Sequence, residues 1–165
     1  MFQPYPHDEF ESLERDLRFE KLAEHISPHA ESEPYVTDLA RAAELPAPAR
    51  AIYFLWMFQA EVAGNGLEYF LLEQQGHFTP QAHEALNMIG ASELVERLEA
   101  GIPHALALDA EFTTGSDLAW FRQFQPREPY PDLESVDDGV YDLVESDLLD
   151  KVNAFIEAQR AVLVA

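Results

Sequence analysis

Residues 61–76, EVAGNGLEYFLLEQQG, decide how we interpret the whole chain. They follow AIYFLWMF at residues 51–58, the longest uninterrupted apolar run in the sequence. Gly64, Asn65 and Gly66 are poor helix formers, yet they interrupt a segment of otherwise helical composition. Because glycine adopts positive φ angles freely and asparagine tolerates them, we interpret the triplet as a short elbow between two buried helices. We expect Asn65 to hydrogen-bond backbone groups at the break.

The alternative is a small-ligand site at the Gly64-Asn65-Gly66 elbow. A phosphate-binding loop has the form G-x-G-x-x-G after a strand or G-x-x-x-x-G-K-[ST], and neither pattern occurs here. We therefore favour a structural role for the motif, whose defining residues are Glu61, Gly64, Asn65, Gly66 and Gly76.

The remainder of the chain is also predicted to be helical, because apolar residues recur at three-four spacing and strand alternation is nearly absent. We expect a first helix from Asp8, with Glu11 completing a capping box, through the buried positions Leu13 and Leu17 to Ile26. Further helices are expected over residues 33–44, 47–63, 67–75 and 79–89, the last with Thr79 as its cap. Another is expected to start at residue 92 and to be kinked or ended by Pro103. A short helix should follow Ser116, and the last helix should run from about residue 138 or 146 to 162. The sequence thus predicts an all-α fold, a compact single domain of residues 1–165 with seven to nine helices.

The net charge of the chain is strongly negative. Thirty-one Asp and Glu against ten Lys and Arg give −21, which repels nucleic acid and anionic membranes and attracts basic surfaces. No apolar run approaches the roughly 20 residues that span a bilayer, and no secretory signal is visible. The absence of cysteine fits a reducing compartment, so we expect a cytoplasmic protein.

Catalytic and metal-binding patterns are missing from the sequence. The six histidines form no H-E-x-x-H motif, and none lies three residues after a glutamate as in di-iron bundles. There is no G-x-S-x-G elbow. We expect no enzyme activity, no cofactor and no metal.

The elbow segment resembles the signature of a bacterial all-helical family of mostly uncharacterised proteins. In the family's usual form, Glu-Val is followed by two polar residues, Gly-Gly-Phe, an acidic residue, Gln, two aromatic residues and Asn-Ser-x-Gly. The residues that match at the same spacing are Glu61, Val62, Gly66, Glu68, Phe70 and Gly76. The block AHEALNMIGASELVERLEAG at residues 82–101 is similar to the family's alanine-rich continuation. The sequence departs from the family's pattern at three places. GNG stands where the family has NGG, Leu67 replaces an aromatic residue, and Tyr69 replaces a glutamine.

This resemblance implies an all-helical fold and a homodimer. The member with an assigned role is a DNA mimic whose acidic surface occupies the DNA-binding face of a transcription factor. By implication, the partner is a basic DNA-binding protein and the role is transcription regulation, without direct binding of nucleic acid or membrane. Two alternatives stay open: an acidic structural or housekeeping domain without a specific partner, and the ligand site at the elbow.

One acidic tract is the predicted partner-binding surface. Residues 132–150 carry eight acidic residues and no basic one: Asp132, Glu134, Asp137, Asp138, Asp142, Glu145, Asp147 and Asp150. On a continuous helix they would give one charge per roughly 3.6 Å, close to the ~3.4 Å per phosphate of a DNA strand. Pro131 and Gly139 argue against a single helix over the whole tract. The first helix adds further acidic residues, which Arg15, Arg18 and Lys21 dilute.

Overall fold

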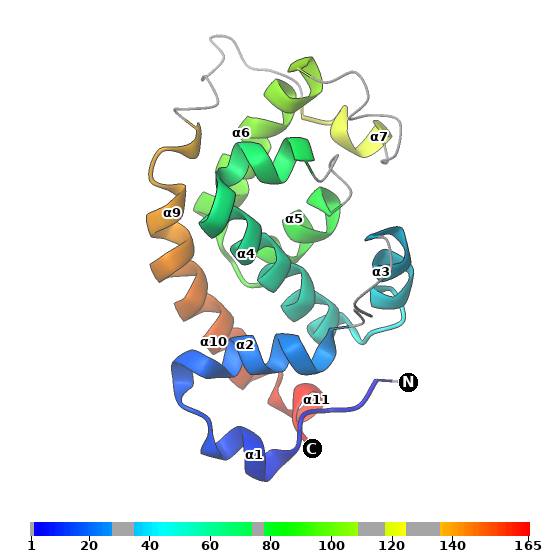
Figure 1. Ribbon diagram of the computed structural model, residues 1–165, viewed down its shortest axis with the longest axis vertical. Coiled ribbons are helices and arrows are strands. Elements are labelled where there is room, and N and C mark those ends of the chain that lie inside the picture. Colours follow the sequence, from blue (N-terminus) through cyan, green and yellow to red (C-terminus); the bar gives the residue numbers. More distant parts are fainter. Residues whose placement is uncertain (1, 28–34, 74–77, 109–117, 125–135) are drawn as a thin grey trace.

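The structure is a computed structural model that describes residues 2–27, 35–73, 78–108, 118–124 and 136–165. Its helices are α1 (His7–Ser12), α2 (Arg15–Ile26), α3 (Tyr35–Ala42), α4 (Ala47–Glu73), α5 (Thr79–Met88), α6 (Ser92–Leu108), α7 (Leu118–Phe121), α9 (Val140–Leu143), the π-helical turn η2 (Val144–Leu148), α10 (Leu149–Ala158) and α11 (Arg160–Leu163). The all-α fold class is confirmed (Figure 1). Among the described residues, no helix has the length and apolar composition that crossing a bilayer requires.

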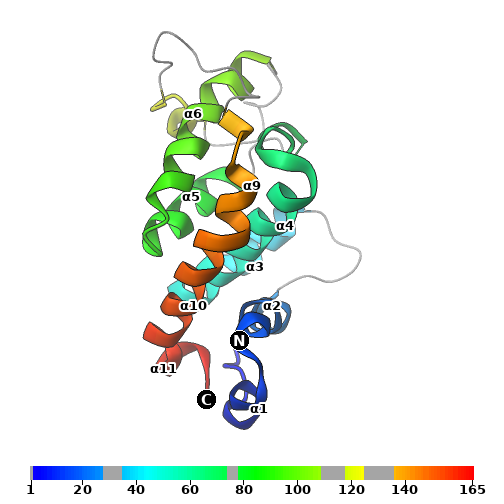
Figure 2. The same cartoon turned by 90° about the vertical axis from the view of Figure 1, so that its left-hand side faces the viewer.

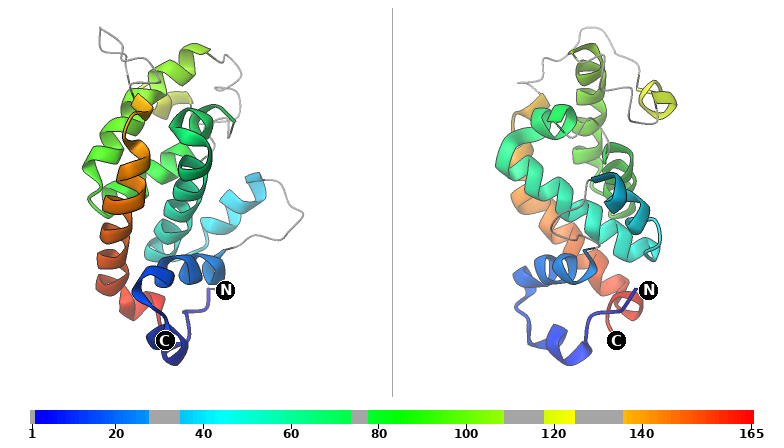
Figure 3. Two further views of the ribbon diagram at one scale, coloured as in Figure 1. Left: turned by 60° about the vertical axis from the view of Figure 1, so that its left-hand side comes forward. Right: turned by 45° about the vertical axis from the view of Figure 1, so that its right-hand side comes forward.

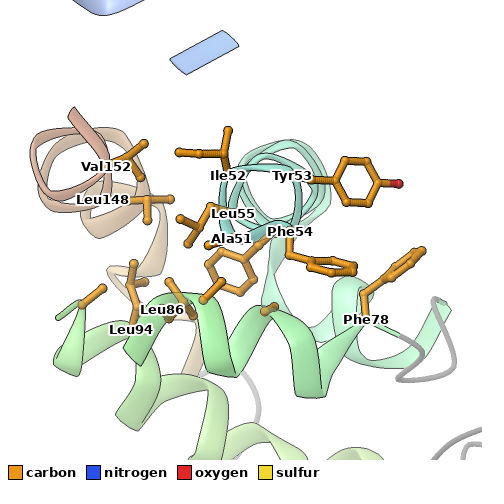
Figure 4. Close-up of a cluster of buried hydrophobic side chains, with 14 of the residues drawn as sticks. Ala51, Ile52, Tyr53, Phe54, Leu55, Phe78, Leu86, Leu94, Leu148 and Val152 are labelled. Atoms are coloured by element: carbon orange, nitrogen blue, oxygen red, sulfur yellow. The ribbon is translucent and has the colours of Figure 1, made fainter. Parts of the chain in front are cut away.

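Helix α4 forms the centre of the structure, and α2, α5, α6 and α9 pack around it (Figures 1 and 3). Its first half is buried almost all round, as its apolar sequence predicts. Figure 4 shows Ile52 and Leu55 facing Leu148 and Val152 of the C-terminal helices, while Phe54 lies near Phe78. The core therefore joins segments that are about a hundred residues apart in sequence.

The elbow in α4 is confirmed at Gly66, the one residue of this helix with non-helical backbone angles (φ 88°, ψ 166°). This region of φ and ψ is essentially open to glycine alone, so a left-handed-tolerant residue such as asparagine does not suffice there. On either side of the elbow, the buried rings of Phe58 and Phe70 meet edge to face at 5.2 Å. The hydrogen bond described for Asn65 goes from its Nδ2 to the Glu61 carboxylate, at 3.3 Å, rather than to the backbone groups that we expected.

The prediction of one N-terminal helix from Asp8 to Ile26 is wrong. Leu13 and Glu14 have extended backbone angles and separate α1 from α2, and no side chain caps α1. The chain before α1 is tied to the C-terminus, because Tyr5 N–H donates to the Leu163 carbonyl and Ala165 N–H donates to the Tyr5 carbonyl. This pairing, in which Tyr5 and Val164 form a parallel bridge, fixes a separate direction for α1.

The change of direction also changes which side chains the N-terminal helices bury. Leu17, predicted to be buried, is 41% exposed, and Leu13 is half-buried. Phe19 takes the core position of α2 instead and is 2% exposed.

Two other local features differ from the sequence prediction: α6 does not end at Pro103, and Thr79 is not the cap of α5. Pro103 lies inside α6, which continues to Leu108, although a proline in a helix interior costs about 3 kcal/mol. Two turns of α6 around it are anchored by the fully buried Leu98, Ile102 and Ala105. Thr79 does not cap α5: it lies within the first turn, and its buried hydroxyl has no hydrogen-bond partner among the described residues.

Candidate protein-interaction surface

The C-terminal helices carry the acidic residues from Asp142 to Asp150 along one side of the molecule, where α9, η2 and α10 follow one another without a break (Figure 2). Their buried residues recur every four positions: Val140, Val144, Leu148, Val152 and Ile156. At 3.6 residues per turn, this spacing rotates the apolar stripe by about 40° at each step, which would carry it off the core. The turn η2 is π-helical, so its hydrogen bonds join residues five apart in place of four and each turn contains more residues than in an α-helix. This wider turn offsets the rotation of the apolar stripe. As a result, the opposite side of this long helix stays in solvent.

The first part of this outward side is a group of unneutralised carboxylates. Asp138, Asp142 and Glu145 are exposed, and the structure gives none of them a basic partner among the residues it describes. We call these three residues the open acidic face. The Asp142 backbone is fixed by the Ser146 hydroxyl, which donates to the Asp142 carbonyl at 2.6 Å within the π-helical turn. Helical turns that are buried on their other side thus present Asp142 and Glu145, and the turn before α9 presents Asp138.

The later acidic residues of the same helix are neutralised. Lys151 Nζ lies 3.5 Å from Asp147, and Arg15 of α2 lies 3.3 Å from Asp150. Further along, Glu157 accepts from Arg18 at 2.6 Å and from Arg160 at 3.3 Å. We call Asp147, Asp150 and Glu157 the paired acidic residues. Asp150 and Glu157 link α10 to α2 and α11, whereas Asp147 pairs within its own helical segment, and all three contribute less to an outward negative field than unpaired carboxylates do.

The acidic residues of the N-terminal helices are also partly neutralised. Glu11 forms an ion pair with Arg160. Lys21 donates to Glu24 at 2.8 Å and to Glu20 at 3.3 Å, and these two bonds, Glu24 first, raise the pKa of Lys21. Glu11, Glu20 and Glu24 are therefore neutralised, whereas Asp8, Glu9, Glu14 and Asp16 are exposed without a basic partner among the described residues.

Asp137 has a structural contact within the protein. Its Oδ1 accepts a hydrogen bond of 2.8 Å from the backbone N–H of Leu67, the first residue after the elbow, seventy positions earlier in sequence. A carboxylate at the start of a helical segment satisfies an otherwise unpaired N–H and interacts favourably with the helix dipole. We therefore separate Asp137 from the open acidic face, although the sequence placed it in the partner surface.

This contact also accounts for the glycine at the elbow. A Cβ atom added to Gly66 would lie 2.7 Å from Asp137 Oδ2, so the carboxylate fills the space that a side chain would need. Nearby, Gly101 of α6 lets that helix approach closely, since a Cβ there would lie 2.7 Å from Leu71 and 3.6 Å from Val136. The elbow thus fixes where the acidic helix begins, which supports the structural interpretation of the GNG motif.

The remaining predicted residues divide by position. Asp132, Glu134 and Gly76 lie outside the described residues. Gly64 has no atom within 4 Å of where its Cβ would be and has helical backbone angles, so the motif requires only its second glycine.

Two features away from the acidic helix have a different character. A cavity of about 460 Å³ lies between the N-terminal segment and the ends of α2 and α3, lined by Phe2, Gln3, His25, Ile26, Arg41, Glu44 and Leu45. His83 lies 2.8 Å from Glu99 and contacts the rings of Trp120 and Phe124 edge to face. Within the described ranges, no group of three histidine or acidic side chains has the arrangement of a metal site.

The fold and this surface define an acidic, all-α protein whose described helices expose many carboxylates, among them the open acidic face. The family of DMP19-like proteins matches residues 43–159, so the chain belongs to that family. The match includes the elbow, the open acidic face and the paired acidic residues, whereas α1, α2 and α3 precede it. No curated protein and no solved structure matches the chain.

Proposed function

We propose that this protein mimics DNA and binds a basic nucleic-acid-binding protein, such as a transcription factor, through the open acidic face. The observation that carries the proposal is that Asp138, Asp142 and Glu145 are exposed without a basic partner among the described residues. The net charge of −21 supports it, because a field of this sign speeds the approach of cationic surfaces. Membership of the DMP19-like family, taken with the resemblance noted above, supports it further.

The mechanism is electrostatic and needs no catalytic group. The negative field steers a basic protein toward the acidic helix, and carboxylates then pair with its arginine and lysine side chains. The two Asp and one Glu take the place of phosphates. As in the family resemblance, we propose that the protein acts as a homodimer, with α9 of each protomer left accessible.

Capture of partners from a lysate of the native organism tests this proposal. The immobilised wild-type protein should retain a basic protein that elutes with salt and that excess duplex DNA displaces. Reversal of the three charges (Asp138→Lys, Asp142→Lys, Glu145→Lys) should reduce retention at least about tenfold, since steering alone contributes 10- to 1,000-fold.

A control with the same change in net charge is available on other helices. Glu68, Glu93 and Glu96 are exposed acidic residues of α4 and α6. Their triple reversal to lysine should leave most of the retention intact. Equal loss in both variants would show that overall charge and not this face binds the partner, and a retained protein that DNA does not displace would rule out mimicry.

A further inference from the structure

An exposed aromatic residue stands among the unneutralised carboxylates. Tyr141 of α9 is 56% exposed, more than the other exposed large hydrophobic residues Leu17, Tyr69, Met88 and Val162. Asp142 follows it directly in sequence, Asp138 lies three positions before it, and Glu145 follows one helical turn later. Its neighbours Val140 and Val144 are buried, which leaves the ring on the outward side of the helix.

The same combination of groups already binds arginine elsewhere in the molecule. The ring of Phe10 has the guanidinium carbons of Arg18 and Arg160 at 4.6 Å and 5.3 Å from its centroid. Glu157 accepts hydrogen bonds from both arginines, and Glu11 pairs with Arg160. An aromatic ring beside carboxylates therefore receives guanidinium groups in this chain, where ring and cation come from α1, α2 and α11.

At Tyr141 an aromatic ring and carboxylates are present, as at Phe10, but the structure describes no arginine or lysine beside them. A guanidinium group is planar, so it stacks on a ring while its N–H groups donate to a carboxylate in two directions. The ammonium group of lysine pairs with carboxylates as a point charge and lacks this flat face. The ring therefore adds a preference that negative charge alone does not provide.

We infer that Tyr141 and the open acidic face form an arginine-binding surface, with the partner's arginine stacked on the Tyr141 ring and paired with Asp138, Asp142 or Glu145. This inference rests on the proposed function and specifies the chemistry of the partner: a protein that presents arginine, rather than lysine, at its contact. The exposed ring would become the central contact, and the carboxylates would surround it, as tyrosine and arginine tend to occupy the centres of interfaces.

Two synthetic peptides of equal charge, one rich in arginine and one rich in lysine, test the inference without the natural partner. Fluorescence anisotropy at low salt should show that the wild-type protein binds the arginine peptide about two- to fivefold more tightly, the factor that an exposed cation–π contact supplies. Tyr141→Leu should abolish that preference while leaving the affinity for the lysine peptide unchanged. Tyr141→Phe, which retains a ring, should preserve it.

The matched control is Tyr69→Leu, since Tyr69 is an exposed tyrosine of α4 (40%) and should not affect either affinity. Circular dichroism establishes that each variant folds. Peptide binding with no arginine preference, or with a preference that survives Tyr141→Leu, would overturn this inference and leave the acidic-face proposal intact. If charge reversal of the open acidic face leaves peptide binding unchanged, the inference is overturned as well, and the lysate capture decides the proposed function separately.

Discussion

The two ends of the C-terminal acidic tract use the same kind of residue in different ways. At its beginning, Asp138, Asp142 and Glu145 face solvent without a basic partner in the described structure. At its end, Asp147 and Asp150 pair with Lys151 and Arg15, and Glu157, beyond the tract, pairs with Arg18 and Arg160. Electrostatic attraction depends on the net field of a surface, so a count of carboxylates does not locate the attractive region. Our proposal places partner binding at the beginning of the tract, whereas the ion pairs at its end connect α10 to α2.

Gly66→Ala is expected to have the largest effect, because it disturbs the point at which the acidic helix is anchored. Alanine at φ 88° and ψ 166° is strained, and its Cβ would displace the Asp137 carboxylate. We expect a loss of about 2–4 kcal/mol in the free energy of unfolding, measured by urea denaturation. Gly64→Ala is the control: with helical angles and open space, it should stabilise the protein by about 0.5–1 kcal/mol. Equal effects of the two substitutions would contradict the structural role of the elbow.

Asp137→Ala tests whether the tract contains a structural carboxylate beside the exposed ones. Removing the hydrogen bond to Leu67 N–H leaves a half-buried donor unpaired, so we expect a loss of about 2 kcal/mol in unfolding free energy. The neighbouring Asp138→Ala should change it by less than about 0.5 kcal/mol, because the Asp138 side chain is exposed. If both variants are equally stable, Asp137 belongs with the open acidic face after all.

Arg18→Gln and Arg15→Gln sharpen the comparison at the other end of the tract. Arg18 is mostly buried, stacks on Phe10 and pairs with Glu157, but Arg160 retains the same ring and carboxylate when Arg18 is replaced. We therefore expect a loss of about 1 kcal/mol in thermal or chemical denaturation. Arg15 and Asp150 are 65% and 79% exposed, so Arg15→Gln should cost less than about 0.5 kcal/mol, and less again in high salt. A larger effect for Arg15 would show that the burial of an ion pair does not determine how much it stabilises this protein.

Much of the fold could be predicted from sequence because helices are formed by local contacts. The apolar run at residues 51–58 specified a buried central helix, and the GNG triplet specified where it bends. The failures are places where distant contacts decide the backbone. The break at Leu13 follows from pairing of Tyr5 with the C-terminus, and α6 continues through Pro103 because its neighbouring turns are buried.

The candidate surface was predictable only in part. The sequence located the acidic tract, and its tyrosine was noted only as one of several aromatic residues near it. The exposure of Tyr141, the pairing of Asp150 with Arg15 and that of Glu157 with Arg18 had no signal in the sequence, since these positions relative to solvent and to α2 depend on packing.

By itself, the sequence determined the helical class, the position of the elbow and a large negative charge, because composition and local spacing are sufficient for these properties. Tertiary structure alone decided which carboxylates pair with distant helices. Arg15 reaches Asp150 across 135 positions, Arg18 reaches Glu157 across 139, and Asp137 reaches Leu67 across 70. Charge pairing depends on distance through space, which the order of residues along the chain does not give.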